Sequence, residues 1–163
     1  MDDTWMIRPE QLDDDQRRII SLPRDGSHLI LGPPGSGKTN LIVLRATRLL
    51  RSQAPDFVVL VFTRTLEEFI ANCPTPYAIP RDKLKTCQRW AMQLVNSLGG
   101  SPSSSLDFTQ QREENCEILT RLVEDQGLAT MYDTILLDEA QDYLPEEVRL
   151  FRRLANHLFC VAD

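Results

Sequence analysis

Residues 29–42, LILGPPGSGKTNLI, constrain the fold more than any other part of the chain. Residues 32–39 fit the pattern G-x-x-x-x-G-K-[S/T] between a short apolar run and an amphipathic segment, the order expected of a strand, a loop and a helix. Glycines let the backbone N–H groups of such a loop close around phosphates, and the helix that follows directs its positive dipole end at them. The sequence therefore predicts an α/β protein that binds a nucleotide.

The residue types in this loop predict individual roles. Lys38 is expected to reach the β and γ phosphates, and the Thr39 hydroxyl is expected to hold Mg²⁺. A glycine-rich turn without a ligand is the alternative, which the flanking strand and helix disfavour. The nucleotide-binding residues predicted from the loop are Gly32, Gly35, Ser36, Gly37, Lys38 and Thr39.

A second segment, ILLDEAQD at 135–142, supplies acidic residues at the end of an apolar run. A buried strand ending at Asp138 presents a carboxylate at the carboxyl edge of a parallel sheet, where open α/β sheets bind ligands. Asp138 is therefore predicted to be the second Mg²⁺ ligand, and Glu139 is predicted to accept a proton from the water that attacks the γ-phosphate. Together with Lys38, these two acids are the predicted catalytic residues.

Apolar periodicity along the rest of the chain predicts alternating strands and helices. This alternation indicates a parallel sheet with helices on both faces, and GGSPSSS at 99–105 is too short to be more than a loop. Strands are expected at 57–62, 133–140 and 158–163, besides the apolar run before Gly32; helices are expected at 9–22, 38–53, 65–73, 86–98, 109–126 and 145–157.

Composition limits the classes of function. The chain has 163 residues, 42% of them hydrophobic, which is enough for one domain with its own core. A net charge of −6 lacks the basic footprint of a nucleic-acid binder, so any nucleic-acid surface has to be local. An acidic start, MDDTWMIRPEQLDDD, and the lack of an apolar run of about 20 residues predict a cytoplasmic protein without membrane contact. The four cysteines and two histidines show no metal or redox spacing and are expected to be structural, with the thiols reduced.

GPPGSGKT followed by DEAQD resembles the UvrD/Rep branch of the superfamily 1 helicases, over residues 16–163. The resemblance implies that residues 1–163 form a single RecA-like P-loop NTPase domain, the first of the two in such a motor. It also implies an ATP hydrolase that uses ATP and Mg²⁺. Gln16, upstream of the loop, then reads adenine, and Gln141 of DEAQD joins the nucleotide-binding residues. Taken alone, Gln16 is equally well interpreted as a surface helix residue.

The same resemblance implies a site for single-stranded DNA. Phe62, Thr63 and Arg64 match the family's motif Ia, and Thr86 begins a partial match to motif Ib. By itself Phe62 is equally well a core residue, and Trp90 either stacks on bases or belongs to the core.

LFCVAD at 158–163 resembles the opening of motif III, whose glutamine would follow Asp163. The family completes its ATP site with arginines from a second RecA-like domain. That domain, in cis or in trans, is therefore an expected partner. We accordingly expect residues 1–163 alone to bind single-stranded DNA weakly and to hydrolyse ATP slowly.

Three functional hypotheses follow. The first is the ATP-binding domain of a superfamily 1 DNA helicase or single-stranded-DNA-dependent ATPase. The second is a small phosphotransferase of the nucleotide-kinase type, but this leaves the EAQD after Asp138 unexplained, and the sequence has no clear arginine-rich lid segment. The third is a non-catalytic interaction module that responds to nucleotide. ATP hydrolysis with single-stranded DNA and no phosphoacceptor separates the first hypothesis from the second.

Overall fold

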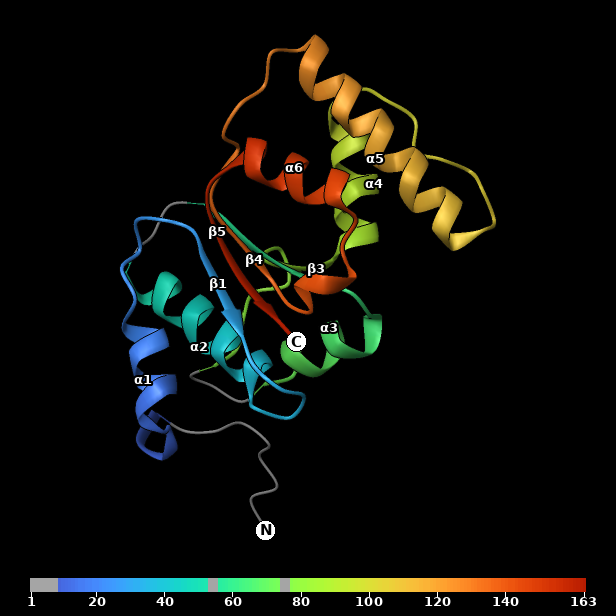
Figure 1. Cartoon of the computed structure of the whole chain (residues 1–163). Helices are drawn as coiled ribbons and strands as arrows, with labels where there is room; N and C mark the ends of the chain where they lie inside the picture. The colour runs from blue at the N-terminus through green and yellow to red at the C-terminus, as the bar shows by residue number, and fades with distance from the viewer. Residues whose placement is uncertain (1–8, 53–55, 74–76) are drawn as a thin grey trace.

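The computed structural model describes residues 9–52, 56–73 and 77–163. Its centre is a five-stranded, all-parallel sheet in the order β1-β5-β4-β2-β3 (Figure 1). This confirms the predicted parallel α/β sheet. The strands are β1 (His28–Leu31), β2 (Phe57–Val61), β3 (Leu84–Thr86), β4 (Tyr132–Leu137) and β5 (Ala155–Ala162).

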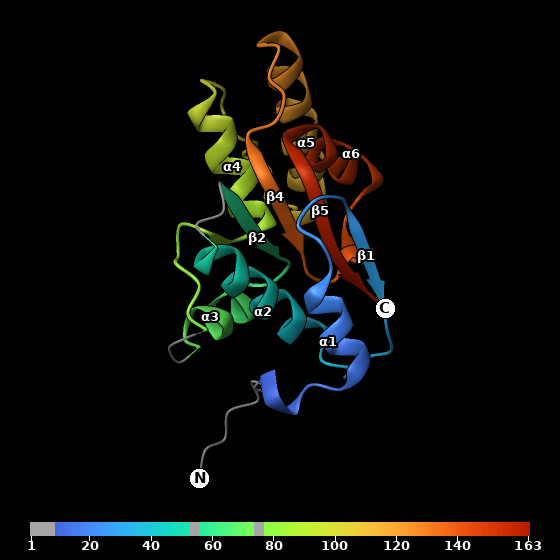
Figure 2. The ribbon, with the colours of Figure 1, turned by 90° about the vertical axis from the view of Figure 1, so that its left-hand side faces the viewer.

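Helices cover both faces of the sheet, as predicted (Figure 2). One group packs on the face of the sheet that carries the β2 side chains of Phe57, Val59 and Val61. The other group packs on the opposite face. The first group is α1 (Asp14–Ser21), α2 (Lys38–Arg51) and α3 (Arg64–Ala71); the second is α4 (Cys87–Ser97), α5 (Phe108–Asp125) and α6 (Pro145–Leu154). Two short 3-10 helices, η1 (Pro9–Gln11) and η2 (Ala140–Asp142), complete the described elements.

The core lies in two layers because the central strands are buried on both sides. Along β2, Val58 and Leu60 face the layer of α4, α5 and α6, while the alternate residues face the layer of α2 and α3. All five β2 residues are buried, which explains the uninterrupted apolar run in the sequence. The edge strand β1 differs, because Leu29 and Leu31 are 62% and 67% exposed.

Two predicted helices differ from the observed ones by more than two residues at an end. The helix expected at 9–22 divides into η1 and α1, because the Asp13 carboxylate accepts a hydrogen bond from the Gln16 backbone N–H (2.7 Å) and caps a new helix start. The helix expected at 145–157 ends at Leu154. Ala155 already pairs with β4 and begins β5, so sheet pairing takes the residues that sequence periodicity assigned to the helix.

Strand β3 was not predicted. It has three residues, too few for a periodic signal, and it forms only because β2 offers a partner, with Val59 opposite Leu84 and Val61 opposite Thr86. The strand matters for the site, since it brings Thr86 to the same sheet edge as the end of β2.

Some predictions fall outside the described residues: the acidic start at 1–8, the last residue of the helix expected to end at 53, and the prolines at 74 and 76. None of the four cysteines, all of which the structure describes, forms a disulfide. In the described ranges, no helix combines the length and the apolar character that spanning a membrane requires.

Candidate functional site

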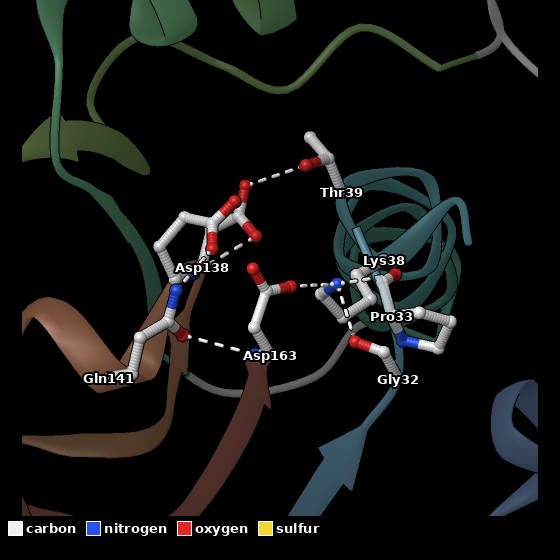
Figure 3. Close-up of polar contacts among 8 residues, drawn as sticks. Gly32, Pro33, Lys38, Thr39, Asp138, Gln141 and Asp163 are labelled. Atoms are coloured by element: carbon white, nitrogen blue, oxygen red, sulfur yellow. Dashed lines mark hydrogen bonds and ion pairs between the residues drawn. The ribbon is translucent and has the colours of Figure 1, made fainter. Parts of the chain in front are cut away.

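The predicted site residues meet at the carboxyl edge of the sheet. Because the strands are parallel and β5 lies between β1 and β4, the residues that follow these three strands are neighbours. They are Gly32 after β1, Asp138 after β4 and Asp163 after β5 (Figure 3). This edge is where ligands of open α/β sheets bind.

The glycines of the loop are required by its conformation. Gly35 and Gly37 have φ of +78° and +81°, in the left-handed region that residues with a Cβ rarely adopt. A Cβ on Gly32 would lie 2.9 Å from the Ser36 hydroxyl. Gly37 is the N-cap of α2, so the helix begins at Lys38 with the N–H groups of its first turn directed at the loop.

Lys38 is buried beneath this loop, with 7% of its surface exposed. Its ammonium donates to the carbonyls of Gly32 (2.8 Å) and Pro33 (3.0 Å) and forms an ion pair with Asp163 (Figure 3). The Lys38 ammonium therefore lies among three oxygen acceptors, one of which, the Asp163 carboxylate, is negatively charged. Asp163 was not among the predicted site residues, although an acid directly after the apolar run of LFCVAD is the same signal that identified Asp138.

The two predicted metal ligands contact each other. The Thr39 hydroxyl donates to the Asp138 carboxylate at 2.8 Å, and the Asp138 side chain is fully buried (Figure 3). Burial raises the pKa of Asp138 above its ordinary value and the nearby charge of Glu139 adds to this, while the hydrogen bond from Thr39 opposes it.

A hydroxyl and a carboxylate are the hard oxygen donors that Mg²⁺ takes from proteins, and Mg²⁺ usually draws its other ligands from phosphates and water. Among the described residues, no group of three or more His, Cys, Asp or Glu is placed to hold a metal on its own. Thr39 and Asp138 therefore fit a metal ion that arrives with a phosphate ligand.

Glu139 has an unusual backbone, with φ of +51° in a residue other than glycine. Its N–H donates to the Asp138 carboxylate (3.1 Å), and its own carboxylate accepts from the Gln141 amide (2.7 Å). The oxygen of that amide accepts from the backbone N–H of Asp163 (3.2 Å). Gln141 thus joins the acidic ends of β4 and β5.

Gln16, the predicted adenine contact, lies against the loop. Its amide N–H donates to the Ser36 carbonyl at 3.2 Å, and its amide oxygen accepts from the Asp13 backbone N–H at 3.2 Å. Within the described residues, these bonds use one of two N–H donors and one of two lone pairs. A donor and an acceptor are left for a base.

The predicted nucleic-acid residues line one groove at the same edge of the sheet. Phe62 and Thr63 follow β2, Arg64 begins α3, and Thr86 ends β3, the neighbour of β2. The groove has a volume of about 720 Å³. Its lining comprises Phe62, Thr63, Arg64, Thr86, Gln88, Arg89, Met92, Gln93, Asn96, Phe108 and Gln111.

Both threonines also have a structural task. Thr63 caps α3 by accepting from the Leu66 N–H, and Thr86 caps α4 by accepting from the Arg89 N–H, each at 3.2 Å. The hydroxyls fix where the two helices begin beside the groove. Trp90 belongs to the core: it is 2% exposed, and its indole N–H donates to the Tyr132 hydroxyl (3.0 Å).

A buried ion pair next to the groove was missed by the sequence analysis. Arg112 of α5 binds the Glu147 carboxylate with two nitrogens and donates to the Asp142 carbonyl at 2.7 Å. Its guanidinium carbon also lies 5.0 Å from the centre of the Phe62 ring. Arg112 therefore joins the groove to the segment that follows Glu139. No sequence signal marks it, since an arginine on an amphipathic helix is ordinarily exposed.

No protein-family model matches this chain, and no curated protein is significantly similar to it. Its function is therefore inferred from its own residues. The site combines a glycine-rich loop under which a lysine is buried, a hydroxyl and carboxylate pair suited to Mg²⁺, and a further carboxylate on a strained backbone. Residues of these kinds have the chemistry to bind a nucleoside triphosphate and to activate a water molecule.

Proposed function

We propose that this chain is the ATP-binding domain of a superfamily 1 type DNA motor, a RecA-like P-loop NTPase that hydrolyses ATP and works with a second RecA-like domain along single-stranded DNA. One observation carries the proposal. A single edge of the sheet places the loop of Lys38 and the Thr39–Asp138 pair next to the groove that starts at Phe62. In a motor, the nucleotide site and the nucleic-acid site have to be coupled, so that binding at one changes binding at the other.

In this proposal each nucleotide contact comes from a residue already at the site. Lys38 exchanges its carbonyl and Asp163 partners for the β and γ phosphates, and Gln16 uses its remaining donor and acceptor for adenine. Thr39 and Asp138 hold Mg²⁺. When bound there, Mg²⁺ would neutralise part of the negative charge on the phosphates.

Hydrolysis then depends on Glu139. Its carboxylate orients a water and takes a proton from it while the water oxygen bonds to the γ-phosphorus and the bond to the β-phosphate oxygen breaks, giving ADP and phosphate. Arginines that stabilise the transferring group are worth about 10³ to 10⁵ in rate in related chemistry. By the family resemblance, these arginines belong to the second RecA-like domain. We therefore expect residues 1–163 to bind ATP and to hydrolyse it slowly.

Titration of a fluorescent ATP analogue with Mg²⁺ tests the binding site. Replacing Lys38 with Ala removes charge-assisted bonds worth roughly 1.5–3 kcal/mol each, so we expect affinity to fall by at least about tenfold. Lys83→Ala is the matched control. Lys83 pairs with Asp56 at the amino ends of β3 and β2, which is the edge of the parallel sheet opposite to the loop. Equal affinity for the Lys38 variant and the unmodified chain would contradict the site assignment.

Turnover tests the reaction class. ATP hydrolysis is measured with and without single-stranded DNA, for residues 1–163 and for the same residues joined to a second RecA-like domain. We expect DNA-stimulated hydrolysis only in the joined protein, and its loss on Glu139→Gln. Transfer of phosphate to an added acceptor would favour the nucleotide-kinase alternative, and nucleotide-dependent partner binding without any hydrolysis would favour the interaction module.

A further inference from the structure

The groove has a second aromatic wall outside the predicted motifs. Phe108, the first residue of α5, is 51% exposed and lines the groove. Its ring lies 6.1 Å from the ring of Phe62 in an edge-to-face arrangement with an interplanar angle of 76°. Phe62 is only partly exposed, so the half-exposed Phe108 ring offers most of the apolar face that a planar ligand could contact.

The charge of the lining favours an anionic ligand. Among the described residues that line the groove none is acidic, although the whole chain has 24 acidic and 18 basic residues. Arg64 is exposed at one side. The Arg89 side chain is 45% exposed, while its partner Glu67, at 2.6 Å, is buried below it. The Arg64 and Arg89 side chains therefore both reach solvent, whereas the Glu67 carboxylate that pairs with Arg89 is buried.

The remaining lining residues can recognise bases. Gln88, Gln93, Asn96 and Gln111 present amides, which both donate and accept hydrogen bonds as base edges do. Gln88 and Asn96 lie eight residues apart on one face of α4, about 12 Å along the helix, a length that accommodates several stacked nucleotides at roughly 3.4 Å each. Gln88 also donates to Gln111, which links α4 to α5.

We propose that Phe108 and Phe62 together form a base-stacking site, and that single-stranded nucleic acid continues from motif Ia along α4 as far as Asn96. This inference rests on the proposed function and extends its nucleic-acid site to α4 and α5. Phe108 is the residue that defines the extension, because it belongs to none of the motifs that resemble the helicase family. Stacking on aromatic side chains is tolerant of base identity, so the site binds without strict sequence preference.

The experiment is fluorescence anisotropy of a labelled 12-nucleotide oligothymidylate with residues 1–163 at low salt. We expect Phe108→Ala to weaken binding by about 5- to 150-fold, the effect of losing one base stack, and Phe108→Trp to restore it. Leu106→Ala is the matched control, because Leu106 is a fully exposed apolar residue two positions away that does not line the groove. An abasic oligonucleotide of the same length should bind the Phe108 variant and the unmodified chain equally.

The outcomes separate this inference from the proposed function. If Arg64→Ala weakens oligonucleotide binding and Phe108→Ala does not, the stacking site is wrong and the proposed function stands. If Phe108→Ala weakens binding of heparin as strongly as that of the oligonucleotide, base stacking is also wrong. If the unmodified chain binds no oligonucleotide at low salt while Lys38-dependent ATP binding persists, both the stacking site and the DNA part of the proposed function fall.

Discussion

At the scale of single residues, Glu139 is held in a left-handed backbone conformation that costs a non-glycine residue roughly 1–2 kcal/mol. Strain of this kind persists at functional sites when the surrounding structure holds it. We therefore predict that Glu139→Gly does not lower the free energy of unfolding, and raises it by up to about 1 kcal/mol, since relief of strain offsets the greater backbone entropy of glycine. Urea denaturation measures this.

The matched variant is Glu139→Gln, which keeps the strained backbone and removes the carboxylate. Both variants should lose ATP turnover in the joined two-domain protein, and only Glu139→Gly should gain stability. A Glu139→Gly protein that is less stable than the unmodified chain by more than about 1 kcal/mol would show that the carboxylate, through its bond with Gln141, stabilises the fold.

At the scale of elements, the Arg112–Glu147 pair holds α5 against the start of α6. The two side chains are 12% and 6% exposed, and the Glu147 carboxylate also accepts from the Leu144 N–H at 2.8 Å. Replacing Arg112 with Met leaves a buried carboxylate without its ionic partner, which costs about 3–5 kcal/mol. We predict a loss of this size in the free energy of unfolding, measured with urea.

The same helix supplies the control. Arg121 pairs with Glu117 on the exposed side of α5, with both side chains at least 70% exposed, so Arg121→Met should cost less than about 1 kcal/mol. Adding Glu147→Met to Arg112→Met should recover part of the loss, because no buried charge is then left. Equal costs for the two arginine variants would show that the pair is not the link between α5 and α6.

At the scale of the whole molecule, folding buries the thiols of Cys73, Cys87 and Cys116 and partly buries that of Cys160. Burial raises the pKa of Cys116 and Cys160 from 9.0 to about 11 each, and nearby Glu147 adds to the effect at Cys116. At pH 8 this leaves about a hundredfold less thiolate than an ordinary cysteine has. We predict that thiol labelling of the folded protein at pH 8 is slower than in urea by at least that factor.

The sign of the pH dependence follows from the same shift. Below pH 9 the thiols are protonated in both states and the contribution to stability is intact. Between pH 9 and about 11 only the unfolded chain loses the protons, so the free energy of unfolding falls as pH rises through this window. Rapid labelling of Cys116 and Cys160 in the folded protein at pH 8, or stability that is flat across this window, would contradict the raised pKa of these two thiols.

From the sequence alone, the parallel α/β class could be predicted, and the structure confirms it; a set of candidate site residues could be predicted as well. Apolar periodicity acts over neighbouring residues, so β2, α2 and α5 could be predicted with small errors at their ends. The loop at residues 32–39 could be predicted because its glycines serve a local backbone conformation. Asp138 could be placed beside it, since parallel strands end at one edge.

Tertiary structure alone decided which distant residues meet. Lys38 and Asp163 are 125 positions apart, and Arg112 and Glu147 are 35 apart, so no local pattern records either pair. Strand β3 exists only through its pairing with β2, and Phe108 joins the groove only because α5 packs against α4. Contacts of this kind depend on the order of strands and the packing of helices, which are properties of the whole chain and not of any window of its sequence.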